Sequence, residues 1–446
     1  HLALLENDHY LEWFRELPEK AQGEIIAAWG APPGQTLNGV PPSMVYDGKL
    51  VITGLNFGKV NVIMQPKRGC AGSRCDGQVC KILHDPDIPP PHQYLATYMY
   101  MDKVFGADVI IHVGTHGNLE WLPGKGAGLS AACWPDIAIG TIPHLYIYNA
   151  DNPAEGVVAK RRSYATLVDH QQAVQTTADT YDALKELEEL LNEYQRTGPE
   201  DKARAHQLEH LIWEAIDRNH LRAEIEAAAP RDFQAVVTRG HELLSRVRNS
   251  QTTIGMHILG ERPQGEDRAE VINTILRFDS NNDLNTRRLV FDLWGEDILT
   301  ALQAPGRLSR RGQVYGELLY AADRLAQEVI HRLLQGENLW QILGEHPDLA
   351  LPEDPALQAR LRRFASLVQD IDRRIEDSEE IEALRHALDG GYVPAGPSGY
   401  ISRGRYDILP TGRNFYNVDP TRIPTQAAYR VGVKLADALL RRFLQE

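Results

Sequence analysis

The stretch Asp108–Ser130, DVIIHVGTHGNLEWLPGKGAGLS, constrains the fold more than any other part of the sequence. It opens with a β-branched run at 109–111, which is typical of a short buried strand. Gly114 and Gly117 then break the strand into a loop that can bring backbone close to a ligand. Because ligands of open α/β sheets bind at the carboxyl ends of strands, we expect a site at this loop.

Three side chains able to bind a metal or move a proton lie in or beside this loop: His112, His116 and Glu120. The glycines favour a strand followed by a loop, with a helical turn that starts near Asn118, a good helix cap. Two imidazoles and a carboxylate suit zinc, cobalt, nickel or iron, and they can also accept protons near neutral pH. A buried core histidine, a helix-capping glutamate and a plain turn would account for the same residues.

Strands and helices alternate around this stretch, which predicts an α/β layered module. Leu50–Pro66 has the pattern of two short strands, and Gln93–Phe105 has that of a helix that leads into the stretch. The order strand, helix, strand favours parallel pairing. His144–Ala150, HLYIYNA, is expected to form a further strand.

A mainly helical region follows this α/β module. From about residue 178 the segments have amphipathic helical spacing, as in YDALKELEELLNEYQ and RLAQEVIHRLLQ. We therefore expect three parts, namely an α/β site module with an N-terminal helix at 1–177, a mainly helical region at 178–390, and a Gly/Pro-rich return segment with a final helix at 391–446. The return segment is expected to pack back on the site.

Composition excludes some classes of protein. A net charge of −14 argues against a nucleic-acid-binding protein, because phosphate binding rests on an excess of Lys and Arg. No run approaches the roughly 18 to 20 apolar residues of a membrane span, and no signal peptide is visible, so we expect a cytoplasmic protein. The sequence begins with His, which suggests a processed product or a piece of a longer chain.

Three of the four cysteines, Cys70, Cys75 and Cys80, are spaced C-x4-C-x4-C. This spacing matches neither the standard zinc patterns nor the ferredoxin patterns. The three thiols could hold an iron–sulfur cluster or a soft metal, or they could be reduced thiols in a glycine-rich loop. So few cysteines fit a reducing compartment.

Basic groups are few in this acidic chain, and several stand at loop positions. An arginine there can pair with a ligand carboxylate, although solvated surface charge is the ordinary alternative. The candidates are Arg68, the run Lys160, Arg161 and Arg162, and Arg413 with Asn414. The phosphate-binding motif G-x-x-x-x-G-K-[ST] is absent from the sequence, because Lys125 is followed by Gly126. The chain therefore shows no ATPase motif of its own.

Several segments together resemble the family of the cobaltochelatase CobN subunit and the magnesium chelatase H subunit. They are WGAPPG, HDPDIPPPHQYLA, FGADVIIHVGTHGNLEWLPGKGAGLS, CWPD at Cys133–Asp136, AKRRSYATLVDH and LPTGRNFYNVDPTRIPT. The resemblance runs in order over essentially all 446 residues and corresponds to the central portion of a much longer large subunit. LEWLPGKG is closer to the cobalt branch than to the magnesium branch, which tends to have LEFMPGK. The cysteine loop departs from the usual pattern, so the metal and the tetrapyrrole stay open.

The resemblance implies insertion of a divalent metal, cobalt or alternatively magnesium, into a tetrapyrrole. The energy would come from ATP hydrolysis on separate AAA+ and integrin-I-domain subunits. It implies metal binding and proton removal by His112, His116 and Glu120, with Glu120 as the essential carboxylate. The carboxylates of a corrin-type or porphyrin macrocycle would be bound by Arg68, Lys160, Arg161, Arg162, Arg413 and Asn414, with His92 at the rim of the pocket.

Two other classes of function remain open at this level. One is a non-catalytic tetrapyrrole-binding or sensing protein, which tight tetrapyrrole binding without neighbouring ATPase genes would favour. The other is an electron-transfer protein with a metal cluster in the cysteine loop, which iron and acid-labile sulfide would favour.

Overall fold

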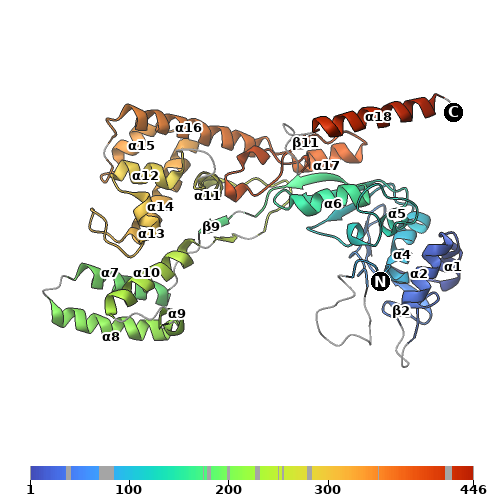
Figure 1. Ribbon diagram of the computed structural model, residues 1–446, viewed down its shortest axis with the longest axis horizontal. Coiled ribbons are helices and arrows are strands. Elements are labelled where there is room, and N and C mark those ends of the chain that lie inside the picture. Colours follow the sequence, from blue (N-terminus) through green and yellow to red (C-terminus); the bar gives the residue numbers. More distant parts are fainter. Residues whose placement is uncertain are drawn as a thin grey trace. The chain divides into compact units, whose positions relative to one another are not determined.

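The computed structural model describes residues 2–36, 42–69, 85–173, 175–177, 182–197, 201–226, 232–249, 251–253, 256–278, 284–349, 351–416 and 424–444. The chain forms two compact units, and their elements are labelled in Figure 1. The first unit comprises His1–His170, Glu380–Gly399 and Gly412–Glu446, and the second comprises Gln171–Glu379 and Tyr400–Thr411. Each unit is thus assembled from segments that are distant in the sequence.

A parallel three-stranded sheet is the centre of the first unit. Its strands, in the order β6-β7-β8, are β6 (Ile110–Val113), β7 (His144–Asn149) and β8 (Thr166–His170). The short helix α5 (Trp134–Ile139) lies between β6 and β7 in the chain, and α6 (Pro153–Ser163) lies between β7 and β8. His112 is in register with Tyr146 on the neighbouring strand. Because the strands are parallel, their carboxyl ends meet at one edge, where the loop after Val113 begins.

The N-terminal part of the first unit packs helices on a small antiparallel sheet of order β1-β3-β2. Buried side chains that include Tyr10, Phe14, Ile52 and Leu95 join these elements into one core. The elements are β1 (Ala3–Leu5), α1 (Asn7–Arg15), α2 (Glu19–Trp29), β2 (Val45–Tyr46), β3 (Lys49–Ile52), the hairpin β4 (Leu55–Asn56) and β5 (Asn61–Val62), α4 (His92–Tyr100) and the π-helical turn η2 (Met101–Phe105).

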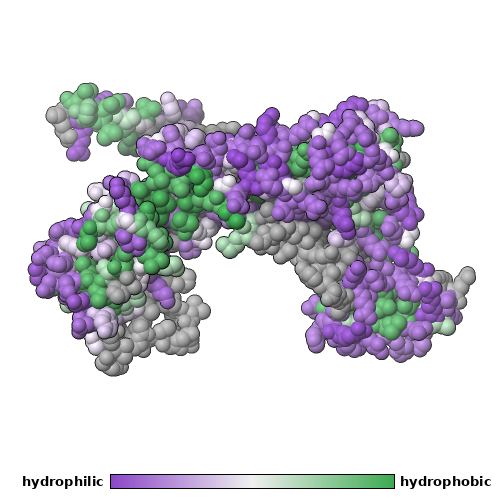
Figure 2. All heavy atoms as spheres, turned by 180° about the vertical axis from the view of Figure 1, so that it is seen from behind, coloured by the Kyte–Doolittle hydropathy of each residue, from purple (hydrophilic) through white to green (hydrophobic). Residues whose placement is uncertain are grey.

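The C-terminal part of the first unit returns to the parallel sheet. It contains α17 (Glu380–Leu388), the parallel pair β11 (Ala395–Gly396) and β12 (Asn414–Phe415), and α18 (Gln426–Phe443). The Asp169 N–H donates to the Arg413 carbonyl over 3.0 Å, which joins this return to the end of β8. Phe415 is fully buried against Gly156, where an added Cβ would come within 2.5 Å of the ring. In α18 no side chain is buried, and Figure 2 shows its apolar residues on the surface.

The second unit is mainly helical. Its first helices lie between β9 (Gln175–Thr177) and β10 (Gln251–Thr253), which pair antiparallel. They are α7 (Asp182–Arg196), α8 (Lys202–Arg218), α9 (Arg222–Glu226) and α10 (Phe233–Asn249), and they share one apolar core. The later elements are α11 (Gly265–Leu276), α12 (Thr286–Trp294), α13 (Ile298–Gln303), α14 (Tyr315–Leu334), α15 (Leu339–Glu345), α16 (Pro355–Glu376) and the 3₁₀ turns η4 (Ile401–Arg403) and η5 (Tyr406–Ile408).

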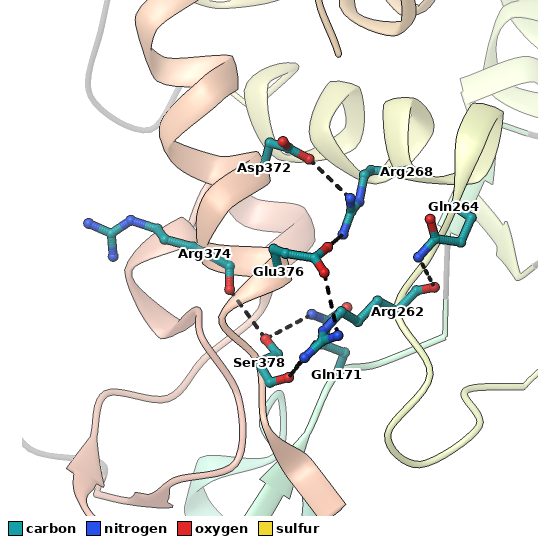
Figure 3. Close-up of polar contacts among 8 residues, drawn as sticks. All are labelled: Gln171, Arg262, Gln264, Arg268, Asp372, Arg374, Glu376 and Ser378. Carbon is teal, nitrogen blue, oxygen red and sulfur yellow. Dashed lines mark hydrogen bonds and ion pairs between the residues drawn. The ribbon is translucent and has the colours of Figure 1, made fainter. Parts of the chain in front are cut away.

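A cluster of ion pairs at the end of α16 ties three parts of the second unit together (Figure 3). Arg268 on α11 pairs with Asp372 at 3.3 Å and with Glu376 at 2.6 Å. Arg262 donates to the carbonyl of Ser378 over 2.8 Å, just after the helix ends. The Gln171 side chain donates to the Ser378 hydroxyl over 3.5 Å. The last turn of α16 is therefore held by opposite charges and by donors to its free carbonyl groups.

The α/β class with a mainly helical region is confirmed by this architecture. The expected strand at 144–150, helix at 93–105 and final helix are present as β7, α4 with η2, and α18. The parallel pairing, however, involves β6, β7 and β8, whereas the strands of Leu50–Pro66 pair antiparallel. Short turns such as Asp47–Gly48 allow adjacent strands to fold back directly, so no crossover helix is needed. Among the described residues, no helix combines the length and the apolar character that a membrane span requires.

Candidate functional site

Glu120 is the centre of the candidate site. It lies in the 3₁₀ turn η3 (Leu119–Trp121) after the β6 loop, and it is fully buried. Its Oε1 atom accepts hydrogen bonds from the Gly117 N–H over 3.3 Å and from the Tyr146 hydroxyl over 3.4 Å. Its buried Oε2 atom has no partner among the described residues. Burial raises the pKa of Glu120, although these hydrogen bonds and the nearby His116 oppose the rise.

His112 lies on β6 within a cluster of aromatic rings. Its Nε2 atom is 3.1 Å from the Tyr98 hydroxyl, and its ring meets the His144 ring edge-on with a centroid distance of 4.4 Å. Burial, with a contribution from His144, lowers the pKa of His112 well below its usual value, and burial lowers the pKa of His144 to about 4. Both imidazoles are therefore neutral at physiological pH.

His116 differs from His112 because it is exposed. Its Nδ1 atom is 2.8 Å from the Gly117 carbonyl, and its ring lies 5.5 Å from the Trp121 ring. His116 opposes the rise in the pKa of Glu120, so the two side chains lie near each other. In the part of the chain that the structure describes, no three His, Cys, Asp or Glu side chains form a group that could hold a metal ion. His112, His116 and Glu120 therefore share one neighbourhood without forming a three-ligand cage.

Gln65 connects the loop to the tyrosines of α4. Its side-chain amide donates to the Tyr98 hydroxyl over 2.9 Å, while its carbonyl oxygen accepts the Asn118 N–H over 2.7 Å. Gly117 is required at this point, because a Cβ there would lie 2.7 Å from the Tyr146 hydroxyl and 3.0 Å from Gln65 Oε1. Asn118 makes no side-chain cap, so the expected capping role is taken by Gln65 from outside the turn.

Arg68 and Arg162 both bind the backbone that follows Glu120. Arg68 Nη1 donates to the Trp121 carbonyl over 2.6 Å, and Arg162 Nη2 donates to the Leu122 carbonyl over 2.5 Å. Arg68 also donates to the Asp85 carbonyl and is buried. Burial lowers the pKa of both guanidinium groups.

The other predicted binding residues take several different positions. Lys160 donates to the Phe415 carbonyl over 3.0 Å and lies 3.1 Å above the centroid of the Tyr416 ring, and burial lowers its pKa to about 8. Arg161 is exposed. The Arg413 N–H donates to Asp169 Oδ1 over 2.7 Å, and Asn414 Oδ1 accepts the Leu167 N–H over 3.1 Å. Lys160 and Asn414 therefore make contacts within the C-terminal return.

His92 lies in the core of the first unit. Its ring nitrogens are 2.9 Å from the Tyr10 hydroxyl and 2.8 Å from the Gly30 carbonyl, so both are occupied. Burial lowers the pKa of this imidazole. The side chain joins the WGAPPG loop to the first helix and to α4. Cys70, Cys75 and Cys80 lie outside the described residues.

Sequence reasoning missed three residues of this site: Gln65, His144 and Tyr146. His144, Tyr146 and Tyr148 alternate along HLYIYNA, so they share the face of β7 that meets His112 across the sheet. That alternation, combined with pairing of the two strands, would have identified Tyr146. Gln65 carries no comparable signal, because its partners come from two other segments.

The comparisons with known proteins agree with this fold. The model of the CobN/Magnesium Chelatase family matches residues 1–446. An uncharacterized protein of Methanocaldococcus jannaschii is 45% identical over 100% of this chain, which spans 35% of that protein. The aerobic cobaltochelatase subunit CobN of Pseudomonas aeruginosa is 36% identical over 98% of this chain and 35% of that protein. The solved catalytic subunit of cobaltochelatase from Mycobacterium tuberculosis is 32% identical with a TM-score of 0.75, covering 99% of this chain and 36% of that one.

The match of the family model over residues 1–446 and the similarity to cobaltochelatase subunits establish the family. The chain belongs to the CobN/Magnesium Chelatase family. It spans about a third of the length of the curated relatives that it matches.

Proposed function

We propose that this chain carries the metal-insertion site of a chelatase large subunit, which inserts a divalent metal, cobalt in the first place, into a corrin-type tetrapyrrole. The observation that carries this proposal is the buried Glu120 carboxylate, which has one oxygen without a partner among the described residues and stands beside exposed His116 at the carboxyl end of β6. The cobaltochelatase names of the Pseudomonas and Mycobacterium relatives support cobalt as the metal.

Glu120 is suited to remove a proton from a pyrrole nitrogen. Insertion of a divalent ion into a macrocycle with two N–H groups releases two protons, so a base is needed at the nitrogens. The Tyr146 hydroxyl and the Gly117 N–H hold Oε1, which leaves Oε2 to accept the proton. Burial raises the pKa of Glu120 and so makes it a stronger base than an exposed carboxylate. The second proton passes to solvent.

The small number of protein ligands fits a site that must give its metal away. The described residues form no group of three metal-binding side chains, so Glu120 and His116 hold the incoming ion with open coordination positions. The four macrocycle nitrogens then replace the remaining water. A closed cage would retain the ion, and transfer would stall.

In this proposal the energy for metal insertion comes from ATP hydrolysis on separate partner subunits. The sequence contains no phosphate-binding motif of the G-x-x-x-x-G-K-[ST] type, so ATP would be bound by separate AAA+ and integrin-I-domain subunits. We place this assembly in the cytoplasm.

The test is Glu120→Gln in the complete large subunit, assayed for metal insertion with its ATPase partners. We expect insertion to fall by at least about 100-fold, the usual value of a lost general base, with tetrapyrrole affinity within about twofold of the wild type. Glu12→Gln, which changes an exposed carboxylate on α1, should leave both unchanged. Full insertion activity in Glu120→Gln would contradict the proposal.

Insertion of magnesium into a protoporphyrin is the second candidate, because the family description covers both chelatases. The same assay with both metals and both macrocycles separates them. Faster insertion of magnesium into protoporphyrin than of cobalt into a corrin-type ring would establish the second candidate.

A further inference from the structure

We infer that Arg68 and Arg162 are positioning residues that hold the Glu120 turn in place, and that they do not bind the carboxylates of the macrocycle. This inference rests on the proposed function of Glu120, and it assigns the two arginines a role that the sequence pattern did not indicate. It also predicts that mutating the two arginines weakens metal binding but leaves tetrapyrrole binding nearly unchanged.

The contacts of the two arginines converge on one short piece of backbone. Arg68 donates to the carbonyl of Trp121 and Arg162 to the carbonyl of Leu122, which are the two residues directly after Glu120. Arg68 also donates to the Asp85 carbonyl, which anchors it to the segment before α4. The turn that carries Glu120 is therefore fixed from two sides by groups that belong to other segments of the first unit.

The hydrogen bonds that the guanidinium groups already make argue against direct substrate binding. Only 6% of Arg68 is exposed, and the Nε atoms of both arginines are buried, with no hydrogen-bond partner among the described residues. A macrocycle carboxylate arriving from solvent would have to displace the carbonyl groups before it could pair with either arginine. Bidentate pairing needs two free donors on one edge of the guanidinium. In Arg68 both Nη groups already bind carbonyls, and in Arg162 the Nη2 group does.

The charges of the two arginines require a reason, because the groups repel each other and are desolvated together. Attraction to Cys133 and then to Glu120 offsets part of this cost for Arg162. The role that the hydrogen bonds of both guanidinium groups share is to hold the backbone that follows Glu120.

Helix α6 supplies a matched control within the same basic run. Successive residues of a helix point about 100° apart, so Lys160, Arg161 and Arg162 face three directions. Lys160 binds the carbonyls of Asn414 and Phe415, and Arg162 binds Leu122, whereas Arg161 is exposed. Arg161→Gln therefore removes the same charge from the same helix without touching the Glu120 turn.

The first measurement follows the position of the turn through Trp121, whose fluorescence is isolated by subtracting the matching Trp121→Phe variant. We expect Arg162→Gln and Arg68→Gln to make Trp121 more accessible to acrylamide, whereas Arg161→Gln has no effect. Arg162→Lys, which keeps the charge and a donor, should restore most of the protection. If circular dichroism shows that Arg162→Gln is unfolded, the accessibility of Trp121 in Arg162→Lys decides the test. Unchanged accessibility in the folded variants overturns the inference.

The second measurement compares metal and tetrapyrrole on the same variants. Cobalt(II) bound at His116 and Glu120 should quench Trp121, whose ring lies 5.5 Å from His116. We expect Arg162→Gln to lower the cobalt affinity obtained from this quenching about 10-fold or more, which is the scale of a lost hydrogen bond to a charged group. The tetrapyrrole affinity, measured by absorbance, should stay within about twofold of the wild type. Weaker tetrapyrrole binding with unchanged cobalt quenching overturns the inference.

Glu120→Gln separates this inference from the proposed function. If cobalt quenching is the same in Glu120→Gln as in the wild type, the metal role of Glu120 fails. The acrylamide result then still decides whether the arginines position the turn. If Glu120→Gln and Arg162→Gln each weaken quenching, and the double variant is no weaker than Glu120→Gln alone, Arg162 acts through Glu120.

Discussion

The two units treat their charged residues in different ways. In the second unit several charges meet opposite charges, both on the surface, as in Arg268 with Glu376, and in the interior, where Asp323 pairs with Arg287 at 2.5 Å and with Arg277 at 3.5 Å. The buried Glu296 is an exception, because it accepts the Arg311 N–H and the Tyr315 hydroxyl. In the first unit the buried charges at the site meet backbone groups instead. Arg162 binds a carbonyl, and Asp169 accepts the N–H groups of Gly412 and Arg413.

This difference separates a scaffold from a site. A charged side chain whose donors or acceptors are taken by an opposite charge is not free to bind a ligand. A buried carboxylate that accepts only weak backbone or hydroxyl donors keeps a free lone pair and a shifted pKa, which are the properties that proton transfer needs. Glu120 and Asp169 each have one buried oxygen without a partner among the described residues. In the second unit the carboxylate of Asp323 accepts two hydrogen bonds from Arg287.

The largest expected effect tests the buried pairing of the second unit. Asp323→Asn removes the partner of two buried guanidinium groups, so we expect the free energy of unfolding of this unit to fall by about 3–5 kcal/mol. Hydrogen exchange of backbone amides in α11 and α14 measures this effect locally. A change below about 1 kcal/mol would mean that the buried pair contributes no more than a surface pair, and the contrast between the units would lose its basis.

An intermediate effect is expected at Asp169 in the first unit, where burial raises the pKa to about 7. Because this value lies above the ordinary one, the folded chain binds more protons than the unfolded chain between about pH 4 and pH 7. The contribution of Asp169 to the free energy of unfolding therefore falls as the pH rises through this window, by about 2–4 kcal/mol in total.

Asp169→Asn isolates this contribution, because the Asn side chain keeps an oxygen for the Gly412 and Arg413 N–H groups. His112 and His144 act with the opposite sign, since their lowered pKa values increase the stability of the fold as the pH rises, and they are present in both proteins. Hydrogen exchange in β8 from pH 4 to 8 measures the free energy of unfolding of both proteins. We expect the wild type to lose stability relative to Asp169→Asn as the pH rises. A constant difference would show that Asp169 is ionised throughout.

The smallest effect is expected at the surface ion pairs of the second unit. Glu376→Gln breaks contacts with Arg262 and Arg268 that the Glu376 side chain makes while 57% exposed to solvent, so we expect a loss of no more than about 1 kcal/mol. The loss should shrink further in 1 M salt, where the Debye length is about 3 Å. Chemical denaturation at low and high salt provides the measurement. A large loss of unfolding free energy that does not depend on salt would show that Glu376 behaves like the buried charges.

The sequence allowed the α/β class and most long elements to be predicted, because hydrophobic periodicity records which face of an element is buried. The strand β8 within AKRRSYATLVDH and the small antiparallel sheets were not anticipated. Their pairing depends on partners elsewhere in the chain, such as Leu5 with Leu50. Local spacing carries no information on such long-range registers.

At the site, local spacing predicted the loop of Glu120 and His116 as a functional site, but it did not anticipate that the basic residues bind backbone carbonyls. A run of three basic residues looks like one binding surface in a sequence, whereas a helix directs its members to different partners. Arg68 and Arg162 lie far apart in the sequence and meet only because both segments fold onto the backbone after Glu120. The predicted roles of Arg413, His92 and the cysteine loop remain predictions.

The return of β12 to β8 has a consequence for how the chain is made. Gly412 donates to Asp169 across 243 positions of sequence, and Phe415 covers Tyr148 and Leu167 in one buried cluster. A ribosome releases the whole helical segment between these points before Phe415 emerges. The sheet that carries the site must therefore remain with part of its apolar face open to water until β12 has been synthesised and packs on it. Slow folding of the intervening helices would lengthen this exposure and invite aggregation of the nascent chain.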